Sequence, residues 1–316
     1  MSQRLIVTPG PHVHKAESVR MIMWMVALSL VPAGIAGIWL FGAGALRAVV
    51  LSVVTAVVVE VVLQKMTRHK VTIADGSAVL TGMLLAYNLP PGAPWWIAVV
   101  GSAFSIAIGK QVFGGLGQNI FNPALVGRVF LMASWPAYMT SYARPLAYDA
   151  VARATPLMLL KEGKALEHIT YLDLFLGRRG GCIGEVCIVA LLIGAAFLLA
   201  RRYISWHIPV VYIGTTAMMM FTFGGRSGLF TGDVLLHVMS GGLVLGAFFM
   251  ATDYVTSPLT RKGQVVFALG CGLLTAVIRL WGGYPEGVAY SILMMNAAAP
   301  IIDRYTKSKV YGGGSR

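Results

Sequence analysis

Apolar residues occur in long blocks along this chain, separated by short polar stretches. A helix needs about 20 apolar residues to span a bilayer, and several blocks reach that length while others are shorter. The pattern predicts an all-α polytopic membrane protein with about ten transmembrane helices. The blocks cover residues 21–41, 43–63, 77–89, 95–110, 122–135, 185–200, 205–223, 234–251, 264–281 and 287–302.

The composition supports this class. Of 316 residues, 57% are hydrophobic and 12% are charged, and the mean hydropathy is +0.74, whereas soluble domains are about 25% charged. The net charge of +13 comes from Lys and Arg residues in short clusters between the apolar blocks. Because these residues do not form one solvated basic face, we expect no nucleic-acid partner.

The basic clusters fall in alternate loops, and the positive-inside rule therefore gives an orientation. Both termini are expected in the cytoplasm, and the long polar interval at residues 136–184 on the outer face. We divide the chain into a first five-helix membrane repeat at 1–135, an outer-face loop at 136–184 and a second five-helix repeat at 185–316.

The two halves are expected to be inverted relative to one another, because five spans reverse the direction of the second half. Residues 76–86, GSAVLTGMLLA, can be laid over residues 241–251, GGLVLGAFFMA. Both blocks are rich in glycine, and the third span is cut short by Pro90 and Pro91. Interrupted spans at corresponding places in two halves are typical of broken helices around a midplane site. We therefore expect two inverted repeats with broken central helices.

The glycines of these two spans have two interpretations. Unwound backbone carbonyls facing a cavity would suit a small alkali cation, while a proton would require a titratable relay such as Glu60 or His237. Alternatively, the glycines only allow helices to pack closely. The glycines concerned are Gly76, Gly82, Gly241, Gly242 and Gly246.

Ionisable residues inside spans are costly, so each should face a partner or a polar cavity. For Arg128, on a helix that begins at Asn122 and Pro123, we expect a pairing role. Near the span ends, extension of the side chain to the membrane surface is the simpler account. The residues inside spans are Glu60, Arg128, His237 and Asp253, and those near span ends are Arg47, Glu185 and Arg279.

The sequence contains no recognisable motif for metal binding or for hydrolysis. The three cysteines, Cys182, Cys187 and Cys271, include no CxxC pair and are too few for an iron–sulfur cluster. We expect them to be free thiols and expect no metal site. No Walker A, HExxH or nucleophile-elbow motif occurs, so we expect no catalytic residue acting alone.

Four stretches carry a resemblance that covers nearly the whole chain. They are DGSAVLTGMLLAYNLPPGAPWW at residues 75–96, KQVFGGLGQNIFNPALVGRVFL at 110–131, YDAVARATPL at 148–157 and ATDYVTSPLTRKG at 251–263. Together they are specific, whereas YDAVARATPL alone would be weak. The chain resembles the RnfD component of the Rnf ion-translocating oxidoreductase complex and, more distantly, the NqrB component of the sodium-translocating NADH:quinone reductase.

The resemblance implies a flavin site. In that family a threonine in an outer-face loop is esterified to the phosphate of FMN, which here implies Thr155. Asp149, Ala154, Thr155 and Pro156 match the acceptor pattern, whereas Ala152 and Arg153 replace its Ser-Gly. Arg153 could approach the phosphate. The alternative for Thr155 is an ordinary threonine before proline in a solvated turn.

The resemblance also implies the function. The chain would be a flavoprotein subunit of a redox-driven translocase, relaying electrons between ferredoxin and NAD with transport of Na+ or H+. It would sit in the bacterial inner membrane with Rnf subunits A, B, C, E and G, after maturation by a flavin transferase. A noncovalent riboflavin is a further cofactor that the resemblance allows. The alternatives are an inverted-repeat secondary transporter or channel for a small solute, and a membrane scaffold.

Overall fold

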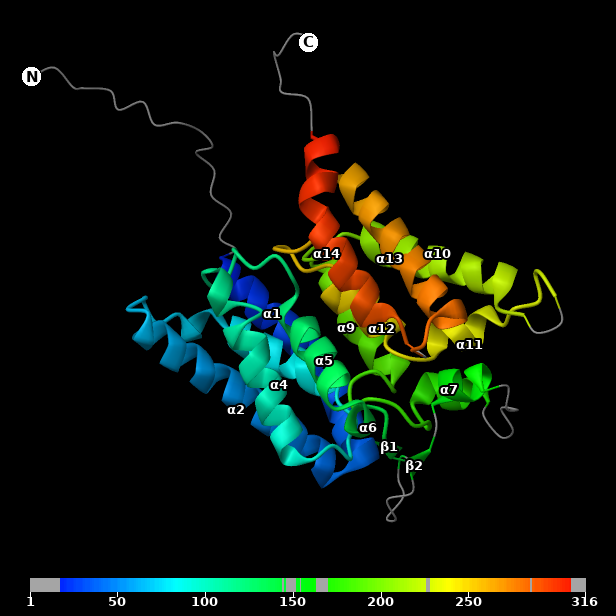
Figure 1. Ribbon diagram of the computed structural model, residues 1–316, viewed down its shortest axis with the longest axis horizontal. Helices are drawn as coiled ribbons and strands as arrows, with labels where there is room; N and C mark the ends of the chain where they lie inside the picture. Colours follow the sequence, from blue (N-terminus) through cyan, green and yellow to red (C-terminus); the bar gives the residue numbers. More distant parts are fainter. Residues whose placement is uncertain are drawn as a thin grey trace, which may run out of the picture.

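All ten predicted apolar blocks form helices, and the described chain adds several short helices and two short strands (Figure 1). The computed structural model describes residues 18–143, 145, 152–153, 155–162, 170–225, 228–284 and 286–307. The first half contains α1 (Val19–Phe41), α2 (Ala43–Met66), η1 (Ile73–Asp75), α3 (Ser77–Tyr87), α4 (Trp95–Ala107), η2 (Gln111–Phe113) and α5 (Pro123–Ser134).

Short elements connect the halves, and a second set of helices follows. The connecting elements are α6 (Pro136–Met139), β1 (Tyr142–Ala143), β2 (Ala152–Arg153), α7 (Pro156–Lys161) and α8 (Tyr171–Leu176). The second half contains α9 (Ile188–Ala200), α10 (His207–Phe223), α11 (Val234–Met239), α12 (Leu243–Leu245), the π-helical turn η3 (Gly246–Met250), α13 (Arg261–Trp281) and α14 (Val288–Tyr305).

Length and composition make four helical segments of the described chain long and apolar enough to cross a membrane. They are Val19–Phe41, Ala43–Met66, Trp95–Phe113 and Arg261–Trp281. Along α2, Val50, Val54, Val58 and Val62 recur every four residues and are all about half exposed. This spacing places them on one helix face, which is the apolar surface expected of a helix that contacts lipid. Together with the ten apolar helical segments, this face confirms an all-α polytopic membrane protein.

Local sequence signals explain where several helices begin and end. Asn122 caps α5, because its Oδ1 accepts hydrogen bonds from the amides of Ala124 at 3.1 Å and Leu125 at 3.4 Å. Pro123 follows at the first helical position, where its missing amide costs nothing. This helix start is confirmed. Gly42, with φ of +68°, separates α1 from α2.

The eighth span is broken, as its glycines indicated. It divides into α11, α12 and η3, with Gly241 at φ of +71° in the break. The third span is a short helix that ends at Tyr87, three residues before Pro90. Both short segments leave helix ends and main-chain groups inside the molecule, where side chains must satisfy them.

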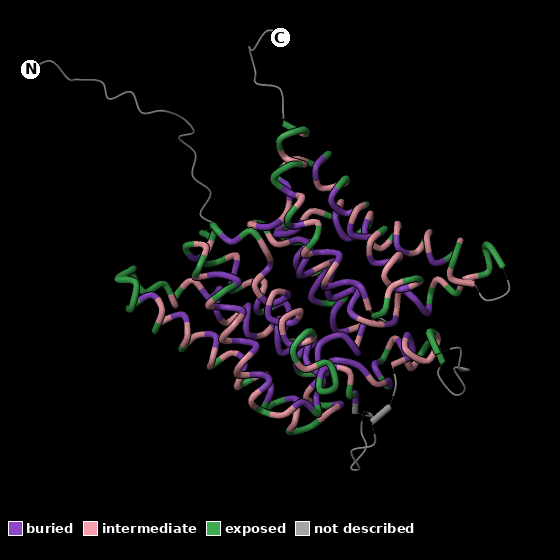
Figure 2. Tube along the Cα trace, viewed as in Figure 1, coloured by how far each residue is buried: buried purple, intermediate pink, exposed green. Residues whose placement is uncertain are grey.

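The two halves have matching packing partners. In the first half α2 packs against α3 and α4, and α4 packs against α5; in the second, α10 packs against α11 and α13, and α13 packs against α14. Between the halves, α1 contacts α9 and α5 contacts α14. The buried residues lie along these contacts (Figure 2). This correspondence agrees with a repeat, and the inverted relation of the halves stays a prediction.

The described ends of the first and last helices lie away from the short elements that connect the two halves. The first turn of α1 and the last turn of α14 lie toward one end, whereas α6, β1 and β2 lie toward the other (Figure 1). The two short strands pair antiparallel, with Tyr142 opposite Arg153.

Gly82 of the third span and Gly246 of the eighth span do not face each other. A Cβ on Gly82 would lie 2.7 Å from Val53 Cα on α2, and a Cβ on Gly246 would contact Val288 Cγ1 on α14. Each glycine therefore allows its own segment to pack closely against a different helix. For these two residues the structure favours close packing over the proposed cation path.

Candidate functional site

Thr155 caps the short helix α7. Its backbone is extended, and its Oγ1 accepts a hydrogen bond from the amide of Met158 at 3.3 Å. The side chain is half-buried, and Pro156 occupies the first position of the helix. The cap uses only the acceptor capacity of the hydroxyl oxygen. Esterification would remove the hydroxyl proton and leave that acceptor in place, so the local geometry fits a phosphoester at Thr155.

The other two predicted flavin-site residues are less fully described. Arg153 lies in β2, with its main chain paired opposite Tyr142. Asp149 lies outside the described residues. The strand pairing brings the segment before Thr155 beside Tyr142, which is buried and lines a small cavity of about 20 Å³.

Two contacts dock α7 onto the second half of the chain. Lys161 Nζ donates to the carbonyl oxygens of Gly282 and, at 2.8 Å, Tyr284, both in the loop between α13 and α14. Leu157 is buried and lies against Gly241, since a Cβ on that glycine would be 2.9 Å from Leu157 Cδ1. The threonine-bearing helix therefore rests on the broken eighth span and on the α13–α14 loop.

An ion pair between Arg128 and Glu286 lies next to the contact of α7 with Gly241. Arg128 Nη2 is 2.5 Å from Glu286 Oε2, and Arg128 Nη1 also donates to Asn88 Oδ1. The other oxygen of Glu286 accepts from the amide of Gly242. The expected pairing role of Arg128 is confirmed, and the pair joins α5 and the end of α3 to two segments of the second half.

The prediction that Glu185 and Arg279 reach the membrane surface is wrong. Arg279 is 6% exposed and donates to the carbonyl oxygens of His237, at 2.6 Å, and Ser240, at 3.2 Å. Glu185 is 3% exposed, and its Oε1 accepts from the amide of Cys182 at 3.0 Å. The physical reason is the break in the eighth span, which exposes main-chain carbonyls that a guanidinium can satisfy. Arg47, by contrast, is exposed.

Glu185 is buried and Glu286 is partly exposed, and their neighbouring carboxyl groups differ in the direction of their pKa shifts. Burial raises the pKa of Glu185, and the nearby Glu286 carboxylate raises it further. Burial also disfavours the charged form of Glu286, but Arg128 and the Gly242 amide outweigh it and lower the pKa of this carboxyl. Both residues lie in loops next to spans. Two neighbouring carboxyls therefore have pKa values shifted in opposite directions, lowered for Glu286 and raised for Glu185.

A second buried ion pair lies near the C-terminal end of α2, which carries Glu60. Lys110 Nζ is 2.6 Å from Glu60 Oε1 and donates to Ser77 Oγ at 2.6 Å. Gln64 and Gln111 donate to the same Glu60 oxygen. The expectation that Glu60 has a partner is confirmed. The sequence did not indicate this partner, because Lys110 is 50 positions from Glu60 and stands at the end of the block at 95–110, yet it is 1% exposed.

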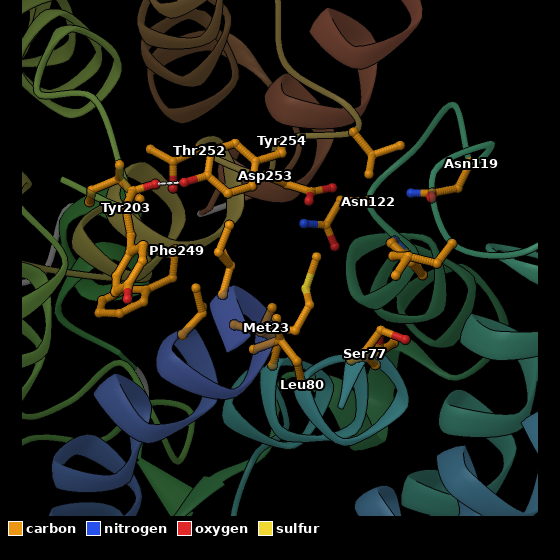
Figure 3. Close-up of a pocket in the computed structure, with 18 of the residues that line it drawn as sticks. Met23, Ser77, Leu80, Asn119, Asn122, Tyr203, Phe249, Thr252, Asp253 and Tyr254 are labelled. Carbon is orange, nitrogen blue, oxygen red and sulfur yellow. Dashed lines mark hydrogen bonds between the residues drawn. The ribbon is translucent and has the colours of Figure 1, made fainter. Parts of the chain in front are cut away.

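A cavity of about 70 Å³ lies beside this pair, lined by α1, α3, the start of α5 and the η3–α13 segment (Figure 3). Polar side chains of Asn119, Asn122 and Asp253 line it together with the aromatic rings of Tyr203 and Phe249. Asp253 is not isolated, since it accepts a hydrogen bond from Thr256 at 3.1 Å. Ligand pockets usually measure about 300–1,000 Å³, so the cavity in this form does not enclose a riboflavin.

The remaining candidate residues are His237 and the three cysteines. His237 is buried in α11, and its own main-chain carbonyl accepts the hydrogen bond from Arg279. Cys182, Cys187 and Cys271 are free. Across the described part of the chain, no group of three or more His, Cys, Asp or Glu side chains could hold a metal ion.

Comparison with known proteins identifies the family. The sequence model of the NQR2, RnfD, RnfE family matches residues 6–312. The chain belongs to this family. It is 51% identical to the D component of the Na(+)-translocating ferredoxin:NAD(+) oxidoreductase complex of Acetobacterium woodii, over 98% of this chain and 95% of that protein. It is 50% identical to the D component of the proton-translocating ferredoxin:NAD(+) oxidoreductase complex of Clostridium ljungdahlii, over 97% and 96%.

A third relative shows how far the similarity extends. The D component of the ion-translocating oxidoreductase complex of Stutzerimonas stutzeri is 41% identical over 95% of this chain and 94% of that protein. The resemblance to RnfD is confirmed over nearly the full chain. Two relatives of almost equal identity carry names with different ions, so overall similarity does not select between Na+ and H+ for this family member.

Two residues near the Arg128 ion pair, Glu286 and Arg179, were not found from the sequence. Glu286 stands in a Gly- and Pro-containing turn between two spans, and Arg179 stands in the 136–184 interval. A lone acidic residue between two apolar helices was the available signal for Glu286, because the unpaired Arg128 required a carboxylate. Arg179 gave no signal, since basic residues in a loop are ordinarily solvated.

Proposed function

We propose that this chain is the RnfD component of an ion-translocating ferredoxin:NAD oxidoreductase, a membrane-bound redox-driven translocase, and that it carries FMN on Thr155. The observation that supports the assignment is the match to RnfD-type proteins over 95–98% of this chain. The protein relays electrons and is not catalytic alone. The flavin, when bound, supplies the electron transfer, while the protein holds and tunes it.

The chain's own residues hold the acceptor threonine in place. Thr155 ends an extended segment and caps α7, so its oxygen is fixed by the Met158 amide. Lys161 and Leu157 dock α7 on the second half of the chain. A covalent link at this position prevents loss of the cofactor, and the docked helix limits how far its attachment point moves. Asp149 and Arg153 complete the proposed site.

The proposed setting is the bacterial inner membrane, with both termini in the cytoplasm and Thr155 on the outer face. The partners are Rnf subunits A, B, C, E and G, and a flavin transferase attaches the FMN. The positions of α1 and α14 at one end and β1 and β2 at the other are consistent with this orientation. A riboflavin in the Asn122 cavity would require that cavity to enlarge.

In-gel flavin fluorescence of the denatured chain tests the proposal, with peptide mass to place the adduct. Wild-type protein is expected to fluoresce, and Thr155→Asn to be colourless. Asn retains the helix cap but has no hydroxyl to esterify, so the variant separates attachment from folding.

Thr170→Ala is the matched control, because Thr170 caps α8 in the same interval. It should keep its fluorescence. A denatured wild-type chain without flavin would contradict the FMN proposal and favour the transporter alternative. Fluorescence that persists in Thr155→Asn would place the adduct on another residue.

A further inference from the structure

The buried cluster next to α7 contains more positive than negative groups. Arg128, Arg179 and Arg279 are each at most 6% exposed, and they share the region with Glu185 and Glu286. If all five groups are charged, the cluster carries one net positive charge.

Arg128 forms an ion pair with Glu286, and Glu185 lies near Arg179 and attracts it. Among the described residues, Arg279 donates only to main-chain carbonyls, and Arg179 Nη2 donates to the carbonyl oxygen of Glu185 at 3.3 Å. In the same part of the chain, the Nε atoms of both arginines and Glu185 Oε2 are buried without a hydrogen-bond partner. Buried charges are normally paired, because an unpaired one is costly to remove from water.

The position of Arg279 connects this charge to the proposed flavin helix. A Cβ on Gly241 would lie 3.3 Å from Arg279 Nη2 and 2.9 Å from Leu157 Cδ1. The guanidinium and α7 therefore meet at the same glycine. Leu157 is two residues after Thr155, and the low-dielectric surroundings screen the charge less than water would.

We propose that Arg279, which meets α7 at Gly241, and the neighbouring Arg179 together form a cationic field that stabilises the reduced, anionic form of the flavin attached to Thr155. This inference rests on the proposed function. An electron from the preceding carrier adds a negative charge to the flavin ring unless a proton follows. The buried guanidinium charges lower the energy of that anionic state relative to the neutral oxidised ring. They therefore raise the reduction potential of this flavin.

The test is a redox titration of the flavin in the purified complex, followed by visible absorbance. The complex with Thr155→Asn provides the spectrum of the other carriers, and subtraction isolates the Thr155 flavin. Arg279→Gln and Arg179→Gln are each expected to shift its midpoint to lower potential, with a larger shift in the double variant. Arg178→Gln, an exposed neighbour in the same loop, should leave the midpoint unchanged.

Arg279→Lys separates charge from hydrogen bonding. Lysine keeps the positive charge but cannot reproduce the two-carbonyl geometry of the guanidinium. A midpoint close to wild type for Lys and lowered for Gln supports the charge effect. Equal midpoints for Lys, Gln and wild type would overturn it. Fluorescence of the denatured band shows separately whether FMN is attached, so failure of the inference is distinct from failure of the proposed function.

Discussion

The buried Glu60–Lys110 pair is expected to stabilise the first half of the chain through charge balance. Glu60 is 0% and Lys110 1% exposed, and their charged atoms are 2.6 Å apart. Replacing Lys110 with Met preserves much of the side-chain volume but leaves the carboxylate buried with only the amide donors of Gln64 and Gln111. The variant therefore loses the only cation paired with Glu60 among the described residues.

The magnitude follows from two independent considerations. Two unit charges about 4 Å apart attract by about 4 kcal/mol at an effective dielectric constant of about 20. Removing one partner of a buried pair costs about 3–5 kcal/mol in measured cases. We therefore expect Lys110→Met to lower the free energy of unfolding by about 3–5 kcal/mol. Replacing both residues, as Glu60→Gln with Lys110→Met, should cost less than the single change, because no buried charge remains.

Denaturant unfolding of the purified protein in detergent, followed by tryptophan fluorescence, measures these differences. Lys65→Met, at an exposed position near the end of α2, is the matched control and should change stability by no more than about 0.5 kcal/mol. If the double variant is as unstable as the sum of the two single variants, the pair contributes no coupling and the reasoning from charge balance is wrong.

Three further predictions concern packing, capping and pH. Gly82→Ala should cost about 1–3 kcal/mol because the new methyl group meets the α2 backbone, whereas Gly214→Ala, with open space around it, should be neutral or slightly stabilising in thermal unfolding. Asn122→Ala should cost about 1 kcal/mol or more through loss of the α5 cap, and Asn122→Ser, which keeps a neutral cap acceptor, should recover part of it. The hydrogen bonds of Thr170 lower the pKa of Asp173. The stabilisation of α8 by this carboxylate is therefore present above the usual carboxyl pKa and is lost as pH falls through the lowered value. Hydrogen exchange of the α8 amides should show this loss in wild type and a weaker loss in Thr170→Val.

The sequence by itself determined the class, the positions of the helices and several of their ends. Apolar segments must be continuous to satisfy the bilayer, so their positions could be read directly. The start of α5 was equally local, because Asn122 caps the amides that immediately follow it. The break in the eighth span was indicated by its own glycines.

Only the tertiary structure decided which charged groups pair. Lys110 stands at the end of an apolar block, 50 positions from its partner Glu60 in the chain, and Glu286 is a turn residue that meets Arg128 only in the folded chain. Arg279 and Glu185 were expected at the membrane surface, yet the broken eighth span supplies carbonyls that keep Arg279 inside. Pairing depends on which segments meet after folding, and the hydrophobic pattern fixes only where each helix lies along the chain. A buried charge finds its partner through contacts between distant segments, and these become definite only when the helices pack.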